Sequence, residues 1–345
     1  MMKIEVLTKY LSGHGGTETV ISSVLNSISF ATELFVAKPM PNVDWLEKIN
    51  DSRITVGKYS DKRFLLFLIY HLIQNSSDEI LILDTDTLKV AKFVKTLFKK
   101  KYKIVSWIHF SINDEKIVDE KELRKADAHL AISSGIKKQL MQLGIPEKQI
   151  FLVYNPIEKN TSLVNRNDSE QIRLKYVGRI QLEGQKNIKF LLEVVRQNPS
   201  IYINVFGSGE DLNEAKQIAD NYGISQRIHW MGWSNDVWND DEKYDALFLC
   251  SNFEGFPMVL LESISRGLPV ISADCPTGPD DIIEAGKNGF LFKKNSLKDV
   301  QKCINSLVSL RTVPSLKVQN SIEKFYGDIY INNLERALST IQNHG

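Results

Sequence analysis

The fold is decided by residues 251–269, which read SNFEGFPMVLLESISRGLP. An apolar run at 246–250 precedes them and another begins at 270, and both are typical of buried parallel strands. Between the runs, apolar residues recur at helical spacing after Pro257, a residue suited to the first position of a helix. Gly267 is suited to end that helix. The stretch therefore predicts a strand, a loop and a helix of a doubly wound α/β sheet.

This predicted unit offers a binding site for an anion. A helix that begins near Pro257 leaves the backbone N–H groups of Met258 and Val259 without helical partners, and they point beyond the end of the strand. The carboxylates Glu254 and Glu262 flank the site. A carboxylate suits hydroxyl donors rather than phosphate. The pattern therefore predicts a ligand with phosphate in its middle and hydroxyls on both sides, as in a nucleotide sugar.

Glu254 and Glu262, with Gly255, Pro257, Gly267 and Pro269 in register, resemble the retaining glycosyltransferases of family four. That family has the GT-B fold, an α/β architecture of two Rossmann-like doubly wound domains facing across a cleft. The resemblance implies that Glu254 contacts the donor sugar and Glu262 the ribose. It places five further residues at the donor site: Gly255, Phe256, Pro257, Met258 and Val259.

Length and composition allow an enzyme of this kind. The chain has 345 residues, enough for two domains, and a formal net charge of +1, which gives no global attraction to nucleic acid. Its three cysteines are too scattered for a disulfide framework or a zinc site. No signal peptide and no apolar stretch near 18 residues is visible. We expect a cytoplasmic protein that does not cross a membrane but can sit on its inner face.

Strand and helix patterns alternate along the whole chain. Strands are expected at 4–8, 33–37, 54–57, 80–83, 104–108, 128–131, 150–153, 172–177, 202–206, 228–231, 246–250, 270–273 and 289–292. Helices are expected at 63–74, 89–100, 134–143, 187–196, 212–222, 257–266 and 297–307.

These patterns divide the chain into two domains. The first, 1–160, is the expected acceptor-binding domain, and the second, 171–321, the nucleotide-sugar-binding domain. The polar segment 158–170 is the expected linker. By resemblance, an amphipathic helix within 322–345 crosses back to the first domain.

A glycine-rich turn after the first strand reads SGHGGTE at 12–18. Glycines at such a turn let the backbone approach a ligand closely. The turn is not Gly-x-Gly-x-x-Gly, which disfavours a nicotinamide cofactor. It resembles the Gly-Gly-x-Glu loop of the same family, so Gly15 and Gly16 are donor-site candidates. The alternative is an ordinary tight turn capped by Thr17.

Two cations are expected at the end of the first strand of the second domain. Arg179 offers a planar fork to a phosphate, and Lys186 offers a point charge. The family has an Arg and a Lys here that hold the diphosphate. Fixed cations stabilise the charge on a departing nucleoside diphosphate, and one such group is worth on the order of 3 kcal/mol. The alternative for Lys186 is a surface lysine.

Three more residues acquire roles through the resemblance. His109, after the fifth strand, is expected near the donor sugar, where it holds a hydroxyl or orients the acceptor rather than acting as a general base. Gly207 is expected to line the nucleotide pocket, with Met231 near the base. The alternative for His109 is a hydrogen-bonded structural residue. Trp233 follows close behind Met231, and its alternative is simple packing.

Asp84-Thr85-Asp86 follows an apolar strand and could hold Mg²⁺ against a diphosphate. Because Arg179 and Lys186 already supply positive charge, we favour a capped turn and expect no metal site and no cofactor.

The segment from Lys92 to Lys103 is strongly basic, with apolar residues at helical spacing. One interpretation is a helix with a solvated cationic face. The other is docking onto anionic lipid of an inner leaflet.

Together the motifs predict a metal-independent hexosyltransferase. It moves a hexose with retention from a nucleotide sugar, a UDP-sugar first of all, to a glycan or glycolipid acceptor. Residues 275–283 resemble the bacterial branch that builds lipopolysaccharide core or capsular glycans. Two alternatives stay open: glycan phosphorolysis, for which no pyridoxal-phosphate lysine site stands out, and a catalytically silent GT-B partner of another transferase.

Overall fold

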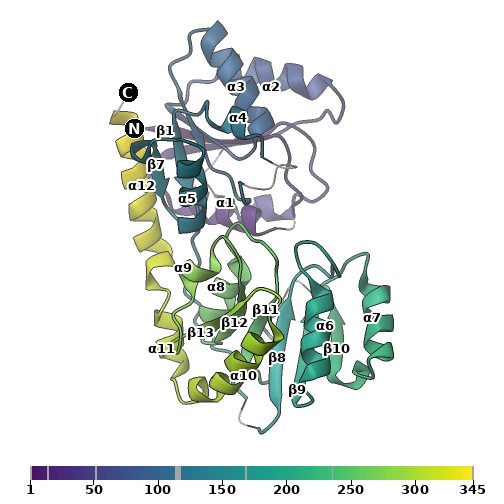
Figure 1. Cartoon of the computed structure of the whole chain (residues 1–345). Helices are drawn as coiled ribbons and strands as arrows, with labels where there is room; N and C mark the ends of the chain where they lie inside the picture. The colour runs from purple at the N-terminus through teal and green to yellow at the C-terminus, as the bar shows by residue number, and fades with distance from the viewer. Residues whose placement is uncertain are drawn as a thin grey trace. The chain divides into compact units, whose positions relative to one another are not determined.

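The computed structural model describes residues 2–13, 15–50, 53–112, 118–167, 169–234 and 236–343. The chain forms two compact units (Figure 1). Unit 1 consists of Met1–Ile157 and Phe325–Gly345, and unit 2 of Glu158–Lys324. The first unit is therefore assembled from two separate parts of the chain.

Unit 1 is built on a seven-stranded parallel sheet with the order β3-β2-β1-β4-β5-β6-β7. β4 and β6 are buried along their whole length, as expected for parallel strands covered on both faces. The strands are β1 (Lys3–Thr8), β2 (Ala31–Val36), β3 (Arg53–Val56), β4 (Glu79–Ile82), β5 (Lys103–Ser106), β6 (Ala128–Ala131) and β7 (Ile150–Leu152). The helices are α1 (Gly16–Ser27), α2 (Arg63–Gln74), α3 (Thr85–Leu97), α4 (Glu120–Leu123), α5 (Ser134–Gln142) and α12 (Gly327–Asn343).

Helix α12 completes unit 1. The Ile157 N–H donates to the Phe325 carbonyl oxygen at 3.0 Å, and the Ser29 N–H donates to Glu335 Oε1 at 2.6 Å. Apolar side chains of α12, including Leu334 and Leu338, are fully buried. The end of the chain is thus an integral part of the fold of the first unit.

Unit 2 repeats the architecture with a six-stranded parallel sheet in the order β10-β9-β8-β11-β12-β13. Its core cluster joins β8, β9, β11 and β12 to helices α6 and α10. The strands are β8 (Ile172–Val177), β9 (Ile201–Phe206), β10 (Ile228–Gly232), β11 (Ala246–Leu249), β12 (Val270–Asp274) and β13 (Gly289–Lys293). The helices are α6 (Ile188–Gln197), α7 (Leu212–Asn221), α8 (Met258–Ile264), α9 (Pro279–Ile282), α10 (Leu297–Arg311) and α11 (Ser315–Asn320).

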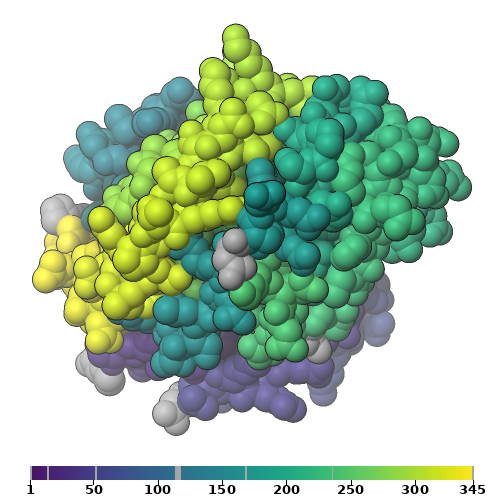
Figure 2. All heavy atoms as spheres, turned by 90° about the horizontal axis from the view of Figure 1, so that it is seen from below, coloured from purple at the N-terminus to yellow at the C-terminus, as the bar shows by residue number. Residues whose placement is uncertain are grey.

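The segment expected to be a linker, 158–170, is packed against unit 2. Arg166 donates from Nη1 to the Val313 carbonyl oxygen at 2.6 Å, and the Val164 N–H donates to the Arg266 carbonyl oxygen at 2.9 Å. Figure 2 shows part of this segment, in teal, at the surface beside the end of α10. Its polar sequence reflects this exposed position rather than a free connection.

Each expected strand has a counterpart in the structure, with ends that differ by a few residues. The expected helix at 89–100 lies at Thr85–Leu97, because Asp84 caps its start and Lys99 takes a positive φ of 51° after its end. The fifth strand ends at Ser106, so His109 follows it by three residues. Pro257 does not occupy the first helical position: its ψ of 90° makes it the extended N-cap residue, and α8 begins at Met258. Among the described residues, no helix has the length and apolar character needed to cross a membrane.

Candidate active site

Both sheets reverse their strand order at one point, which is where doubly wound sheets bind ligands. In unit 2 the reversal lies between β8 and β11. The loops that follow these two strands are joined directly. The Asn252 N–H donates to the Gln185 carbonyl oxygen at 2.8 Å, and Asn252 Nδ2 donates to the Gly184 carbonyl oxygen at 2.6 Å. Residues far apart in sequence thus form a single surface at the carboxyl ends of the strands.

The two loops bring together two charged residues that the sequence analysis singled out, Lys186 and Glu254. Lys186 Nζ lies 2.8 Å from Glu254 Oε1, and Gln185 Nε2 donates to Glu254 Oε2 at 3.4 Å. The Lys186 side chain is 20% exposed and that of Glu254 9%. Attraction between such sheltered charges is stronger than at an open surface. Lys186 is therefore paired and sheltered, and it is not a free surface lysine.

Residues 277–278 contact the loop that carries Glu254 and restrict its backbone. The Thr277 hydroxyl donates to the Glu254 carbonyl oxygen. Gly278 has a φ of +99°, and a Cβ built on it would lie 2.5 Å from Pro257 Cδ. Phe256 and Met258 are buried, so their side chains support the loop. These contacts fix where the carboxylate of Glu254 points.

Arg179 and Gly207 lie at neighbouring strand ends. The Gly178 N–H donates to the Phe206 carbonyl oxygen at 2.9 Å, which continues the pairing of β8 and β9 beyond the strands. A Cβ on Gly207 would lie 1.9 Å from the Gly178 carbonyl oxygen. The two backbone segments can therefore lie this close only if residue 207 is glycine. The Arg179 side chain is exposed and makes no hydrogen bond or ion pair with the described residues. Its guanidinium can therefore receive an anion.

Met231 stands at the end of β10 with 47% of its surface exposed. The Gly207 N–H donates to the carbonyl oxygen of the adjacent Gly232 at 2.8 Å. Met231 thus lies on the strand next to the one that leads into Gly207. An exposed apolar side chain at this edge suits the flat face of a nucleobase.

Helix α8 opens with the N–H groups of Met258 and Val259, which have no acceptor among the described residues. Further along the helix, Glu262 Oε2 accepts from Trp238 Nε1 at 3.4 Å. Burial raises the pKa of Glu262, and attraction by Arg266 opposes the shift. The Arg266 guanidinium in turn lies 5.1 Å from the centre of the Trp238 ring.

In unit 1, the glycine-rich turn is closed by Glu18 and not by Thr17. Glu18 Oε1 accepts from the Gly13 N–H at 2.7 Å, and a Cβ on Gly15 would lie 2.7 Å from Glu18 Oε2. Gly15 is the N-cap of α1, and Gly16 is its first residue. His14, in the middle of the turn, lies outside the described residues. The glutamate of the Gly-Gly-x-Glu pattern therefore turns back and accepts a hydrogen bond from the backbone of the loop that precedes it.

His109, also in unit 1, is 9% exposed. Burial lowers the pKa of His109 to about 3, so the ring is neutral at ordinary pH. Its ring packs against that of Trp107 at an interplanar angle of 61°, with ring centres 4.8 Å apart. Its buried Nε2 has no hydrogen-bond partner among the described residues. A buried ring nitrogen without a partner can serve a ligand hydroxyl.

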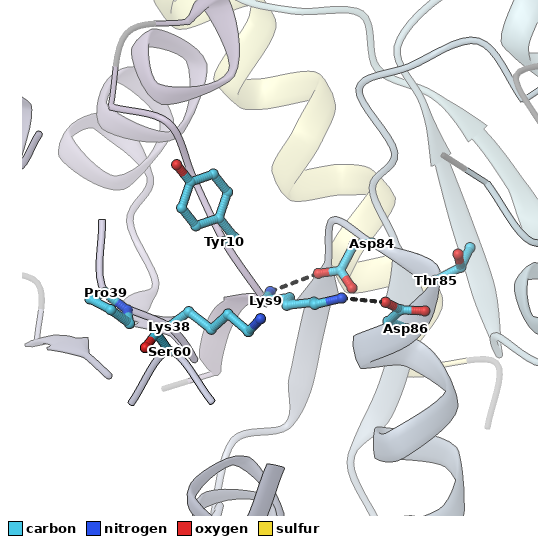
Figure 3. A pocket seen from close by; sticks show the side chains of 8 residues that line it. All are labelled: Lys9, Tyr10, Lys38, Pro39, Ser60, Asp84, Thr85 and Asp86. Carbon is cyan, nitrogen blue, oxygen red and sulfur yellow. Dashed lines mark hydrogen bonds and ion pairs between the residues drawn. The ribbon is translucent and has the colours of Figure 1, made fainter. Parts of the chain in front are cut away.

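A polar pocket of about 530 Å³ lies in unit 1 (Figure 3). Its lining includes Lys9, which follows β1, and Asp84, which follows β4, and the order of this sheet reverses between those two strands. Figure 3 shows Lys9 directed toward Asp86, and their Nζ and Oδ2 atoms are 2.6 Å apart. The remaining lining residues are Tyr10, Lys38, Pro39, Ser60 and Thr85.

Asp84 forms the capped turn that the sequence favoured. Its Oδ1 accepts from the Thr87 N–H at 2.8 Å, and its Oδ2 accepts from the Lys9 N–H at 2.7 Å. Among the described residues, no group of three or more potential metal ligands comes together.

Sequence reasoning missed several contributors to the site of unit 2. Gln185 shares the carboxylate of Glu254, Asn252 joins the two loops, and Trp238 holds Glu262. Trp238 lies in the polar stretch 234–243, and an aromatic residue there was a usable signal. The roles of Gln185 and Asn252 depend on contacts that no local pattern reveals.

Comparison with known proteins agrees with this architecture. Residues 157–324 match the sequence model of the family described as "Glycosyl transferases group 1". Lipopolysaccharide 1,6-galactosyltransferases of Salmonella typhimurium and Escherichia coli are each 33% identical to this chain, and each match covers 98% of both chains.

Solved structures show the same relationship. One described as lipopolysaccharide outer core galactosyltransferase WaaB, apo form, superposes with a TM-score of 0.85 at 32% identity, covering 98% of this chain and 99% of that one. Anabaena Alr3699/HepE in complex with UDP-glucose gives a TM-score of 0.79 at 16% identity, covering 99% and 100%, which shows a likeness of fold.

Two Rossmann-like parallel sheets, each with one reversal of strand order, together with these neighbours, define a glycosyltransferase of the GT-B class. The chain belongs to the glycosyl transferases group 1 family. The resemblance first seen at Glu254 and Glu262 is confirmed at the level of the family.

Proposed function

We propose that this enzyme is a retaining hexosyltransferase that uses a UDP-sugar and acts on a bacterial cell-surface acceptor. Galactose is the first sugar to test and lipopolysaccharide core the first acceptor, because the full-length relatives are named lipopolysaccharide 1,6-galactosyltransferases. UDP-glucose and UDP-N-acetylglucosamine, and glycan or glycoprotein acceptors, are the alternatives. The reaction belongs in the cytoplasm, at the inner face of the plasma membrane.

The observation that carries the proposal is the ion pair between Lys186 and Glu254, together with the unpaired guanidinium of Arg179 in the same loop as Lys186. A donor offers a diphosphate to the two cations and sugar hydroxyls to the carboxylate. On this interpretation, Lys186 exchanges part of its contact with Glu254 for the diphosphate when the donor binds. Glu262, held by Trp238, would accept from a ribose hydroxyl.

Chemistry then proceeds by breaking the bond between the anomeric carbon and the diphosphate oxygen. Negative charge grows on the departing diphosphate, where Arg179, Lys186 and the N–H groups of Met258 and Val259 stabilise it. The acceptor oxygen bonds to the anomeric carbon on the face that the diphosphate leaves. The acceptor proton passes to the departing phosphate oxygen, which accounts for retention without a protein base.

Roles for the unit 1 residues follow from their own surroundings. The neutral, unpartnered Nε2 of His109 suits a hydroxyl of the sugar or the acceptor. Gly15 and Gly16 would leave room for the donor at the start of α1. The pocket of Figure 3, with Lys9, Lys38 and Ser60, would receive acceptor groups. No cofactor or metal is required in this proposal, because the protein supplies the cations.

A panel of UDP-galactose, UDP-glucose and UDP-N-acetylglucosamine tests the proposal. Each is incubated with purified lipopolysaccharide truncated before its outer core, and products are read by mass spectrometry and by the anomeric proton coupling in NMR. We expect one hexose added, with the α-configuration of the donor. A product of inverted configuration would contradict the mechanism.

Thermal shift with the same nucleotides supplies a readout that does not depend on the acceptor. A ligand at 100 times its Kd stabilises the folded state by about 2.7 kcal/mol. Binding of UDP without transfer or donor hydrolysis would instead favour a silent partner of another transferase. Failure to bind any uridine nucleotide would overturn the donor class itself.

A further inference from the structure

Helix α2 of unit 1 carries an unusual outer face. Its sequence, RFLLFLIYHLIQ, is apolar nearly all around, but only Leu68 and Leu72 are buried. Leu65, Leu66 and Tyr70 are 39%, 69% and 64% exposed. A surface helix of a globular protein normally shows polar residues on its outer side. The outer face of α2 is therefore built to contact something other than water.

Helix α3 extends this apolar surface. It packs beside α2, as Figure 1 shows, and Phe93 and Leu97 are 58% and 60% exposed. A groove of about 480 Å³ between the helices is lined by Leu65, Ile69, Val90 and Phe93, among others. We call Leu65, Leu66, Tyr70, Phe93 and Leu97 the apolar face. Contiguous exposed apolar surface of this kind marks an interaction site.

Lysines surround the apolar face, and the structure sorts them into two groups. Lys92 and Lys95 lie 3.7 and 2.6 Å from carboxylate oxygens of Asp127, so they serve the fold. The exposed lysines of the second group make no ion pair with the described residues: Lys62, Lys89, Lys99 and Lys101.

Nearby acids do not cancel this charge. Asp61 is paired with Arg63 at 3.0 Å, and Asp86 with Lys9 at 2.6 Å. The basic segment from Lys92 to Lys103 is thus only part of a larger surface. Within this segment, Lys92 and Lys95 are paired with Asp127, so Lys99 and Lys101 are the lysines available to a partner.

We propose that this two-helix surface docks onto an anionic lipid bilayer. The apolar face enters the boundary between headgroups and acyl chains, and Lys62, Lys89, Lys99 and Lys101 contact lipid phosphates. An apolar centre with a cationic border matches the two layers of an anionic leaflet. A second copy of the chain would bring these same uncompensated lysines together, which like charges disfavour.

The surface also adjoins the polar pocket of Figure 3. Lys9 and Asp86 line both the pocket and the groove between α2 and α3. A bilayer seated on the apolar face would therefore hold the pocket at the level of the headgroups. That position would suit an acceptor anchored in the same membrane, and only this last step rests on the proposed function.

Liposome flotation tests the docking without any need for activity. The full chain is mixed with vesicles of phosphatidylcholine alone or containing about one-third phosphatidylglycerol. We expect flotation with the anionic vesicles, weakened by salt, and little with the neutral ones. Equal flotation with both, or none with the anionic vesicles, would overturn the proposal.

Variants separate the two parts of the surface. The double change Leu66→Ser with Tyr70→Ser, and the double change Lys99→Glu with Lys101→Glu, should each lower the bound fraction at least tenfold. Val308→Ser with Leu316→Ser is the matched control, because those side chains in unit 2 are 58% and 55% exposed. It should float like the unchanged chain.

Folding and self-association are checked on the same samples. All three variants alter exposed side chains, so their circular dichroism and melting temperatures should match the unchanged chain. As a second measurement, Leu66→Trp should be quenched by brominated acyl chains only in anionic vesicles. A dimer in sedimentation that Leu66→Ser with Tyr70→Ser abolishes would instead assign the face to a second copy and refute the lipid proposal.

Discussion

Lys186 Nζ lies 2.8 Å from Glu254 Oε1 and links the loop after β8 to the loop after β11. The two residues stand 68 positions apart in sequence and meet where the strand order of unit 2 reverses. The ammonium group of Lys186 and the carboxylate of Glu254 balance each other's charge. On the proposed function, a bound diphosphate would compete with Glu254 for the lysine, so the two partners should respond to substitution in opposite ways.

Glu254→Gln should strengthen binding of UDP while it impairs transfer. The change removes a negative charge beside the diphosphate and frees Lys186, which we expect to lower the Kd for UDP on the order of tenfold, or about 1.4 kcal/mol. Transfer should fall by two orders of magnitude or more, because the sugar loses its carboxylate contact. Calorimetry with UDP and a turnover assay measure the two effects.

Glu193→Gln is the matched control for that change, because Glu193 pairs with Arg196 on the exposed side of α6. Neither UDP affinity nor turnover should move. Weaker binding of UDP by Glu254→Gln would show that the carboxylate does not compete for Lys186.

Arg179→Ala should lower kcat/KM by two to three orders of magnitude, since one preorganised charge at a developing anion is worth about 3 kcal/mol. The melting temperature should stay the same, because the side chain is exposed and makes no ion pair with the described residues. Arg196→Ala, which removes an exposed guanidinium from α6, is the control. If Arg179→Ala left kcat/KM unchanged, Arg179 would not be a residue that stabilises the diphosphate.

His109 should stay neutral as the pH falls through 6.5, the ordinary value for histidine, because burial lowers its pKa to about 3. The unfolded chain binds a proton in this range and the folded chain does not. The free energy of unfolding therefore falls as the pH drops from 6.5 toward 3, by at most about 1.4 kcal/mol per pH unit from this residue.

An NMR titration of the His109 ring measures this prediction directly, with His109→Gln identifying the signal. The same variant should lose part of its acid sensitivity in thermal melts. A ring that titrates near 6.5 would show that His109 is open to solvent.

EDTA should leave the transfer rate unchanged, because Arg179 and Lys186 supply the positive charge near the diphosphate. Asp84→Ala should instead lower the free energy of unfolding by about 1 to 2 kcal/mol, the usual effect of removing a helix N-cap. Turnover with and without EDTA, and denaturant unfolding, measure the two outcomes. Complete loss of transfer in EDTA, restored by Mg²⁺, would restore the metal interpretation of Asp84 and Asp86.

The fold could be predicted from the sequence wherever one local rule dominates. Helix α2 has the predicted limits because its apolar run ends at Gln74 and Asn75. Short elements such as α9 (Pro279–Ile282) were not predicted, because four residues carry too little periodicity. The end of α3 was placed too late because Phe98 and the lysines after it still fit a helical pattern, although Lys99 adopts a positive φ.

The sequence predicted individual residues of the candidate site but not the contacts between them. Glu254, Glu262, Arg179 and Lys186 were found by motif. In the structure Arg179 and Lys186 lie in the loop after β8, Glu254 lies in the loop after β11, and Glu262 lies on α8. The ion pair of Lys186 and the hold of Trp238 on Glu262 arise from folding, which brings distant loops together. Such contacts depend on three-dimensional packing and leave no periodic trace in the sequence.

Glu79 should make the stability of unit 1 depend on pH. It is fully buried in β4, its oxygens have no hydrogen-bond partner among the described residues, and burial raises its pKa to about 8. Above 4.5 the unfolded chain releases a proton that the folded chain retains up to about 8, so this residue lowers stability progressively across that window.

Glu79→Gln should therefore melt at a higher temperature than the unchanged chain near pH 8, and the difference should shrink as the pH falls toward 4.5. Thermal melts across this range measure the effect. Lys103→Gln, which removes a cation that lowers the Glu79 pKa, should move the melting temperature in the opposite direction at high pH. A pH-independent difference for Glu79→Gln would show that the carboxyl is ionised in the folded chain.

Helix α12 has a consequence for the order in which the protein matures on the ribosome. Residues 1–157 are synthesised first, yet they lack the buried surface that Leu334 and Leu338 provide until the last helix emerges. Unit 2 is continuous in sequence and does not include α12. A stop codon before residue 325 would therefore leave unit 2 complete and unit 1 with an uncovered apolar flank.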